Sequence, residues 1–418
     1  MNSDIHDFHK MTLNERRDTV RKLRSLSDED MEIMKNNTDI KDLENMIENV
    51  ISTMEIPVGI ATNFKINNKD YLIPMCIEEP SVVAACSHGA KIARVSGGFK
   101  AYSMESLMRG ELQLYDVPDR DSAIISIFQN KQKILDMANT RSKTLSSMKA
   151  GAMDIEISAI KDYIVLYLII NVKDAMGANV INTMLEFIAP FIEDITGGKI
   201  NLRIMSNLTT ERISYAHAKF KKELIGGEKI VNRIIMASNL AKQDIYRATT
   251  HNKGIMNGID AVILATLNDF RAEEANAHAY ASINNYHSLT DYYSDENGDL
   301  IGSIKIPIST GIVGGATRTS KKASLSLKIL NISSSQEMAD VLACVGLAQN
   351  FAAMRALSNE GIQKGHMKLH ARNIAISAGA TDKNVNAIVE KMMEKNTINY
   401  SAAKELLVKY NGDNNGKF

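Results

Sequence analysis

Apolar and polar positions alternate with different periods along the chain, and these periods predict its elements. Near the start, Thr12 followed by Glu15 is a capping-box pattern, which predicts a helix in a charged leading segment that ends near Asn45. Alternating apolar residues on both sides of Asn67 and Asn68 then predict a β-hairpin.

A helix of small residues is predicted after this hairpin, over PSVVAACSHGAKIARVSGG (80–98). Pro80 is expected in its first turn, where a missing N–H is tolerated, and Gly97 and Gly98 follow its end. Its alanines and its internal glycine suit close packing against other elements.

Residues 110–206 carry a self-contained pattern of strands and helices. In order, the segments are the strand GELQLYDV, the helix DSAIISIFQNKQKILDMANTRS with Asp121 as its candidate cap, the strands MDIEISAI and DYIVLYLIINV, the helix GANVINTMLEFIAPFIEDITGG and the strand KINLRIMSN. The order β-α-β-β-α-β is that of the ferredoxin-like fold.

The rest of the chain is predicted to be mainly helical. The predicted segments are a helix over 216–248 with a break near Gly226 and Gly227, a hairpin over 295–308 that turns at Asn297 and Gly298, a glycine-rich loop over 309–320, an alanine-rich helix over 335–361 and a helical unit over 365–411. Residues 412–418 are predicted to be disordered.

The predicted fold class is therefore α+β. A large, mostly helical domain (1–106 and 212–358) is expected to hold an inserted ferredoxin-like domain (107–211), with a helical C-terminal unit (362–418) after it.

The composition excludes several classes of protein. Lysine plus arginine equals aspartate plus glutamate, at 49 each, so no global charge favours nucleic acid or an anionic membrane. The longest apolar stretch (163–172) is too short to span a bilayer, and the N-terminus lacks the layout of a signal peptide. Three scattered cysteines form no disulfide framework and no CxxC pair. The expectation is a cytoplasmic globular protein.

One turn is a candidate phosphate site. The chain has neither a P-loop nor a Rossmann fingerprint. However, a buried strand leads into Asp174, Gly177 allows the backbone to turn, and a helix is predicted to begin near Asn179. Amide hydrogens at such a helix start face a bound pyrophosphate well. An ordinary strand-to-helix turn is the alternative.

Three polar positions carry other candidate chemistry. Glu79, after Glu78, is either a helix-dipole partner or a carboxyl that holds its proton as a general acid. Lys253 lies in the polar run YRATTHNKGIMNGID (246–260), where the open question is whether the amine is merely solvated. Asp269 is either a helix N-cap or a partner of Lys253.

His366 and His370 lie four residues apart, which puts them on one helical face. The glutamate of the HExxH zinc motif is replaced by Met367, so a solvated or capping histidine is favoured over a metal ligand. No metal site is predicted.

Taken together and in order, eight blocks resemble the 3-hydroxy-3-methylglutaryl-coenzyme A (HMG-CoA) reductase family. They are ENVI (48–51), EEPSVVAA (78–85), DAMGAN (174–179), YRATTHNKGIMNGID (246–260), ATLND (265–269), GIVGGAT (311–317), VGLAQN (345–350) and GHMKLHARN (365–373). The run HNKGIMNGID and the lack of a membrane anchor resemble the soluble second class of bacteria and some archaea.

The resemblance implies a reaction and a set of catalytic residues. The reaction reduces the thioester to an alcohol by two hydride transfers and gives mevalonate and free coenzyme A, a step of the mevalonate pathway of isoprenoid biosynthesis. Lys253 matches the lysine that stabilises the oxyanion, Asp269 matches the aspartate that holds this lysine, and Glu79 matches the proton-donating glutamate. His366 matches the histidine that protonates the departing thiolate, and His370 is expected to matter less.

Binding residues and assembly are implied in the same way. The matching substrate positions are Ser81, Arg247, Asn252 and Asn257, and the matching cofactor positions are Asp174, Met176, Gly177, Ala178 and Asn179. The large domain is then the substrate-binding and dimerisation domain, the inserted domain binds NAD(P), and the C-terminal unit is a mobile flap. The family also implies a homodimer with active sites between subunits, which in some members assembles into hexamers.

The choice between NADPH and NADH depends on one corner of the inserted domain. Members that use NADH carry an aspartate just after the first helix, where it accepts hydrogen bonds from the ribose hydroxyls. Ser142 aligns with that position here, between Arg141 and Lys143, which suits the 2′-phosphate of NADPH. A solvated helix end is the alternative.

The sequence leaves two other functions open. One is a catalytically inactive relative that senses coenzyme A or a nucleotide, which an assay of thioester reduction would distinguish. The other is the same enzyme working in the oxidative, mevalonate-consuming direction, which the sequence does not decide because a catalyst accelerates both directions.

Overall fold

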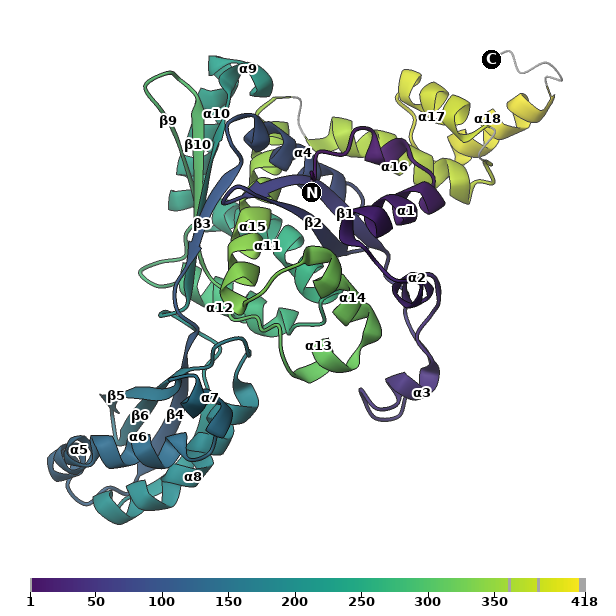
Figure 1. Cartoon of the computed structure of the whole chain (residues 1–418). Helices are drawn as coiled ribbons and strands as arrows, with labels where there is room; N and C mark the ends of the chain where they lie inside the picture. Colours follow the sequence, from purple (N-terminus) through teal and green to yellow (C-terminus); the bar gives the residue numbers. More distant parts are fainter. Residues whose placement is uncertain (1, 360–361, 382–383, 413–418) are drawn as a thin grey trace.

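The structure is a computed structural model that describes residues 2–359, 362–381 and 384–412, without the side chains of residues 316, 318, 362–369 and 412. Figure 1 shows a large body, a smaller α/β unit at its lower left and a helical unit at the C-terminal end. Three separate clusters of buried apolar residues correspond to these three parts, with members between 61 and 354, between 108 and 205, and between 371 and 407.

The large body is built on a six-stranded sheet in the described part of the chain, with the order β2-β1-β3-β8-β10-β9. Its strands are β1 (Val58–Ile66), β2 (Lys69–Cys76), β3 (Phe99–Ser103), β8 (Ile213–Phe220), β9 (Thr290–Ser294) and β10 (Leu300–Pro307). The pair β1 and β3 is parallel, and the other neighbours are antiparallel. The predicted hairpin at Asn67 and Asn68 is confirmed, because both residues adopt the positive φ that its tight turn requires.

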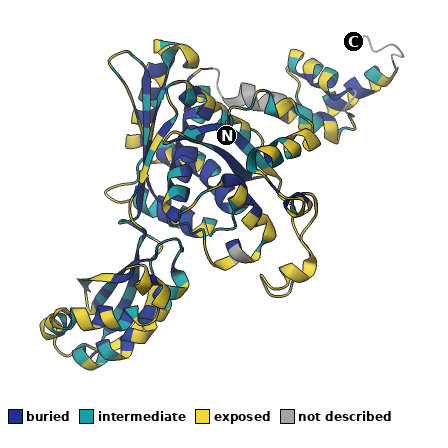
Figure 2. Ribbon diagram, in the orientation of Figure 1, coloured by how far each residue is buried: buried dark blue, intermediate teal, exposed yellow. Residues whose placement is uncertain are grey.

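The helices of the large body include one central helix, α15, which packs against the sheet. They are α4 (Val82–Val95), α9 (Lys222–Ile225), α10 (Glu228–Gln243), α11 (Ile245–Ala265), α12 (Phe270–Ala281), α13 (Gly315–Thr319), α14 (Lys321–Leu330) and α15 (Ser335–Ser358). Within the described residues, α15 alone is long and apolar enough to cross a membrane, but 67% of its apolar window is buried inside the protein. It is therefore a core helix, as Figure 2 makes plain.

The smaller unit has the predicted β-α-β-β-α-β order. Its elements are β4 (Leu107–Tyr115), α5 (Arg120–Gln129), α6 (Lys131–Asn139), α7 (Lys143–Ser147), β5 (Gly151–Ile160), β6 (Tyr163–Asn171), α8 (Ala178–Thr196) and β7 (Lys199–Met205). The sheet order β5-β6-β4-β7, antiparallel throughout, is ferredoxin-like. One side of this sheet packs against α8 and α6.

Short helices flank the large body at both ends. The N-terminal ones are η1 (Phe8–Lys10), α1 (Leu13–Arg24), α2 (Asp28–Lys35) and α3 (Ile40–Leu43), and the C-terminal ones are α16 (Ile362–Ser377), α17 (Val385–Glu394) and α18 (Tyr400–Gly412). The predicted capping box is confirmed, since Thr12 accepts from the amide of Glu15 and the Glu15 carboxylate accepts from that of Thr12. Of the predicted disordered tail, residues 413–418 lie outside the described residues.

Two elements were predicted wrongly. The end of the predicted glycine-rich loop over 309–320 forms helix α13 (Gly315–Thr319). The start of the expected helix over 216–248 belongs to strand β8, where Ala216, Ala218 and Phe220 are buried and His217 is exposed. Alanine and lysine favour helices, but pairing with β3 and β10 on both sides decides this segment.

Helix starts also differ from the predictions. Helix α4 begins at Val82, after Ser81, whose φ of 75° cannot belong to a right-handed helix, so Pro80 lies before the first turn. Asp119 rather than Asp121 caps α5, because its carboxylate accepts from the amide of Ser122 at 3.1 Å. The predicted single helix over 121–142 is divided near Asn130 into α5 and α6.

Candidate active site

Lys253 and Glu79 form the centre of the candidate site. The polar run around Lys253 forms the middle of helix α11, and the Lys253 Nζ atom lies 3.1 Å from Oε2 of Glu79. Glu79 lies in the loop between β2 and α4. Gly258 sets how closely α11 approaches α15, because a Cβ there would lie 2.9 Å from the Cβ of Gln349. The glycine thus serves helix packing.

Asn257 and Arg247 lie on the same helix as Lys253. Asn257 follows by one turn, and its Nδ2 atom is 3.5 Å from the same Glu79 oxygen. Arg247 lies in the first turn of α11, where its backbone amide donates to Asp244 at 2.7 Å. Burial lowers the pKa of its guanidinium, which stays charged at neutral pH.

Asp269 is the N-cap of α12, which is one of the two roles that the sequence predicted for it. Its Oδ1 atom accepts from the amides of Arg271 and Ala272, each at 3.1 Å, and forms an ion pair with the Arg271 guanidinium at 3.2 Å. Helix α12 packs against α11. The ion pair of Lys253 in the described structure is with Glu79, not with Asp269.

Asn252 faces the protein interior. It is fully buried, its Nδ2 atom donates to the Tyr286 hydroxyl at 3.2 Å and to the His287 carbonyl at 2.9 Å, and its Oδ1 atom accepts from the Leu289 amide at 3.0 Å. These bonds fix the segment 286–289 against α11. In the described structure the Asn252 side chain therefore does not point into the site, and it holds the segment 286–289 against the helix that carries Lys253.

Sequence reasoning missed three acidic residues on the packed helices α11 and α12, namely Asp260, Glu273 and Glu274. Burial, a hydrogen bond to Glu274 and the charges of Glu274 and Glu273 raise the pKa of Asp260. A hydrogen bond from His278, at 2.8 Å, lowers the pKa of Glu274 instead. One proton is thus held on Asp260 while Glu274 stays ionised. The available signal was the pair Glu273 and Glu274 in an alanine-rich helix.

The predicted phosphate turn has the expected local shape. Gly177 has a φ of 107° and precedes α8, and a Cβ there would lie 2.6 Å from Cγ1 of Val172. No acidic side chain lies in the first turn of α8 to compete for its amides. Asp174 turns away from this helix start, since its Oδ1 atom accepts from the Ser335 amide at 2.8 Å. The turn fits a pyrophosphate through its backbone amides.

Ser142 lies after α6, as predicted, and it caps α7 by accepting from the Leu145 amide at 3.3 Å. The Arg141 guanidinium lies 4.7 Å from the ring centroid of Phe187 on α8. The basic corner of Arg141, Ser142 and Lys143 therefore adjoins the helix that begins at the phosphate turn.

His366 falls on helix α16, but its side chain lies outside the described residues. His370, four residues later, is exposed. No three histidine, cysteine, aspartate or glutamate side chains in the described ranges gather as a candidate metal site.

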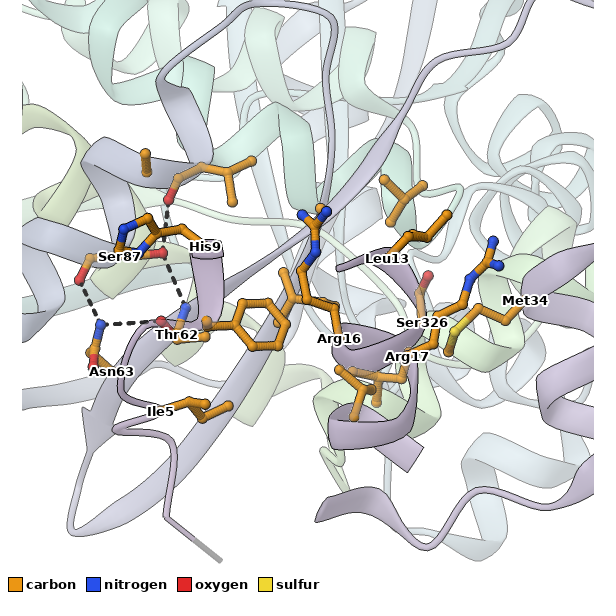
Figure 3. Close-up of a pocket in the computed structure, with 18 of the residues that line it drawn as sticks. Ile5, His9, Leu13, Arg16, Arg17, Met34, Thr62, Asn63, Ser87 and Ser326 are labelled. Carbon is orange, nitrogen blue, oxygen red and sulfur yellow. Dashed lines mark hydrogen bonds between the residues drawn. The ribbon is translucent and has the colours of Figure 1, made fainter. Parts of the chain in front are cut away.

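A cavity of about 950 Å³ lies between the N-terminal segment and α4. Figure 3 shows Ser87 on its wall bonded to the β1 residues Thr62 and Asn63, with Arg16 and Arg17 of α1 at the opposite side. The lining also includes Val83, near the start of α4. The cavity thus combines apolar walls with cationic side chains and reaches the helix that follows Glu79.

These features define a class of α+β proteins in which a ferredoxin-like domain, rather than a Rossmann domain, is inserted into a helical body that carries a lysine–carboxylate site. The family model described as hydroxymethylglutaryl-coenzyme A reductase matches residues 12–371. The chain therefore belongs to the HMG-CoA reductase family, whose members are oxidoreductases.

Individual relatives agree over nearly the whole chain. The 3-hydroxy-3-methylglutaryl-coenzyme A reductase of Archaeoglobus fulgidus is 49% identical over 412 residues, which are 97% of this chain and 94% of that protein. A probable reductase of Borreliella burgdorferi is 35% identical, over 98% of this chain and 96% of that protein. The class II enzyme of Streptococcus pneumoniae, solved with NADPH in open conformations, matches with a TM-score of 0.81 and 35% identity, over 96% of this chain and all of that chain.

Proposed function

We propose that this chain reduces HMG-CoA to mevalonate and free coenzyme A, in the biosynthetic direction, with two molecules of NADPH. The observation that carries the proposal is the Lys253–Glu79 pair, at 3.1 Å, on a helix that also presents Asn257 and Arg247. Such a pair places a positive charge and a carboxyl group that can transfer a proton at one point, as reduction of a carbonyl requires.

Lys253 is proposed to stabilise charge on the carbonyl oxygen. When bound, NADPH supplies the hydride for each of the two reductions. Negative charge then develops on the former carbonyl oxygen, and the ammonium of Lys253 stabilises it. Glu79, which contacts this ammonium, is proposed to deliver the proton that the oxygen takes up.

Two further residues are proposed to act around this pair. His366 protonates the thiolate that leaves when mevaldyl-CoA collapses to mevaldehyde, and the flap 362–418 brings it to the substrate. Asp269 orients Lys253, which requires its carboxylate to exchange Arg271 for the ammonium on the neighbouring helix.

Substrate recognition is proposed to involve the start of α4 and of α11. Arg247 is suited to bind the substrate carboxylate as a bidentate pair, with Ser81 and Asn257 as further contacts. Asn252 is proposed to act indirectly, because the protein occupies its amide group. The cavity beside α4 is proposed to take the coenzyme A portion, with Arg16 and Arg17 facing its phosphates.

The inserted domain, 107–211, is proposed to bind the dinucleotide. The turn from Asp174 through Met176 to Asn179 holds the pyrophosphate through the first amides of α8, and the corner at Ser142 holds the 2′-phosphate. The hydroxyl between two cations is the reason to prefer NADPH.

A second copy of the chain is the proposed partner. Ile47, Ile51 and Met54, around the ENVI block, expose 65%, 94% and 89% of their surface, which is unusual for large apolar residues. Burial against a second copy in the cytoplasm, as a homodimer or a hexamer, removes this exposure and places the block at an active site between subunits. Sedimentation of the wild type and of Ile51→Asp tests this, and identical oligomers would exclude the segment from the interface.

The activity is tested with purified protein, HMG-CoA and NADPH. We expect mevalonate and coenzyme A to form, with two NADPH oxidised for each mevalonate. Absence of turnover together with tight binding of HMG-CoA would instead identify a non-catalytic relative.

A further inference from the structure

We propose that Glu273 is a positioning residue for the dinucleotide, because it anchors the loop 309–313 that in turn holds the cofactor turn 174–177. The proposal rests on the proposed function, since it takes the turn 174–177 as the pyrophosphate site. Glu273 lies on α12, and its hydrogen bonds go to Ser309 rather than to the turn 174–177, so it acts through the loop.

The anchor itself is short and buried. One oxygen of Glu273, Oε1, accepts from the backbone amide of Ser309 at 2.7 Å and from the Ser309 hydroxyl at 2.6 Å. Glu273 is 3% exposed and Ser309 is 1% exposed. Hydrogen bonds from two donors to one ionised, buried carboxylate oxygen are strong, so they fix the start of the loop.

The loop 309–313 then contacts the cofactor turn through hydrogen bonds between the two backbones. The amides of Ile312 and Val313 both donate to the carbonyl oxygen of Asp174, at 2.9 and 3.3 Å. A Cβ on Gly311 would lie 2.5 Å from the amide nitrogen of Met176, so the two backbones are in direct contact and only glycine fits. A displacement of the loop therefore displaces the turn.

The same anchor connects the turn to the catalytic residues. The Gly311 amide donates to Asn268 at 2.9 Å, next to Asp269, and the Glu273 amide donates to the Asp269 carbonyl at 3.2 Å. Asp269 is thus the N-cap of helix α12, and the loop anchor Glu273 lies in the first turn of the same helix. Because both residues lie on α12, a shift of this helix would move the cofactor turn and the proposed catalytic residue Asp269 together.

The charge of Glu273 is set by its surroundings. Burial raises the pKa of Glu273 to about 7, while its bonds to Ser309 and the charge of Arg212 oppose this rise. The other titratable groups near it are Asp269, whose charge adds to the rise, and the protonated Asp260. Arg212 is also buried, and it donates to the Thr310 carbonyl at 2.7 Å, so the loop is held from both sides.

Protonation of Glu273 weakens this anchor. Below pH 7 the neutral carboxyl accepts from Ser309 less strongly, since the bonds lose their charge assistance. Arg212 also loses one of its opposing charges. The loop and turn are then less fixed. Binding of the dinucleotide is expected to be tighter at pH 8 than at pH 6 for this reason.

Three variants separate charge from structure. Glu273→Gln keeps an acceptor oxygen but removes the titration, Ser309→Ala removes only the hydroxyl bond, and Glu273→Val removes the anchor altogether. Glu296→Gln, an exposed glutamate in the β9–β10 turn, is the matched control. Glu273→Val should raise the NADPH KM and Kd about tenfold and leave the HMG-CoA KM nearly unchanged.

The decisive readouts include two that need no turnover. NADPH Kd is titrated by its fluorescence at pH 6, 7 and 8, and hydrogen exchange of the amides of residues 311–313 is measured on the protein without cofactor. In the wild type, both protection and affinity should fall from pH 8 to pH 6, and in Glu273→Gln this fall should be smaller. The 2′-phosphate of NADPH titrates near pH 6, so the titration is repeated with NADH.

The outcomes distinguish the two proposals. Equal pH dependence of Kd and of exchange in the wild type and Glu273→Gln would overturn the anchoring role, whatever the activity. A wild type that fails to reduce HMG-CoA but still shows the pH-dependent exchange would overturn the proposed function and leave the anchor in place.

Discussion

Lys253 on α11 places its ammonium 3.1 Å from a carboxylate oxygen of Glu79, a residue 174 positions earlier in the chain. The pair is open to solvent, with 60% of the lysine side chain and 37% of the glutamate side chain exposed. Exposed ion pairs contribute little to stability. Stability of the fold therefore does not explain this pair, which agrees with the catalytic role proposed for it.

Lys253→Ala is expected to lose about a hundredfold or more in kcat, as other enzymes do when an oxyanion donor is removed. Its free energy of unfolding should stay close to that of the wild type because the pair is exposed. Steady-state kinetics and urea unfolding measure the two effects. Lys242→Ala, which breaks a surface pair with Asp291, is the control, and near-normal turnover of the Lys253 variant would reject the assignment.

His366→Gln is expected to stop reduction of the full thioester while sparing reduction of free mevaldehyde, which has no thiolate to expel. The two half-reactions are assayed separately with NADPH. His370→Gln, one helical turn away on α16, is the matched control and should be milder. Equal damage to both half-reactions would indicate a structural role for His366.

The sequence predicted the features that depend on neighbouring residues. The turn at Gly177 follows from a strand, a glycine and a helix in succession, and Asp269 was identified as a possible N-cap from its place before a helical pattern. Strand β8 was missed because its pairing partners lie far away in the chain, and its own alanines favour a helix.

Side-chain direction within the site was beyond sequence reasoning. Asn252 and Lys253 are adjacent in one polar block, but successive residues of a helix point about 100° apart. Lys253 therefore faces solvent and Glu79, whereas Asn252 faces the core. The carboxylates of Asp260, Glu273 and Glu274 were missed for the same reason, since their burial arises from the packing of α11 against α12.

Ser142→Asp is expected to move the preference from NADPH towards NADH, because a carboxylate repels the 2′-phosphate and accepts bonds from the ribose hydroxyls. Asp can still cap α7 as Ser142 does, so the local fold should persist. The ratio of kcat/KM for the two cofactors measures the change. Ser147→Asp, at the exposed end of the same helix, controls for added charge, and a wild type that prefers NADH would refute the interpretation of this corner.

Asp260 makes the stability of the fold depend on pH in a direction opposite to that of a salt-bridged carboxylate. Burial, a hydrogen bond to Glu274 and nearby carboxylates raise its pKa, so the folded protein keeps a proton that the unfolded chain releases above about pH 4. The stabilising contribution is complete below that pH and is lost as pH rises towards the raised pKa.

Asp260→Asn removes this titration while its amide still donates to Glu274, so the variant should lack the decline. Between pH 5 and 8 the difference in unfolding free energy, wild type minus variant, should fall by up to about 1.4 kcal/mol per pH unit. Urea unfolding at fixed protein concentration measures it, because subunit association also contributes. Asp18→Asn, an exposed residue of α1, should give a flat difference, and parallel pH curves for wild type and Asp260→Asn would show that Asp260 is ionised in the folded protein.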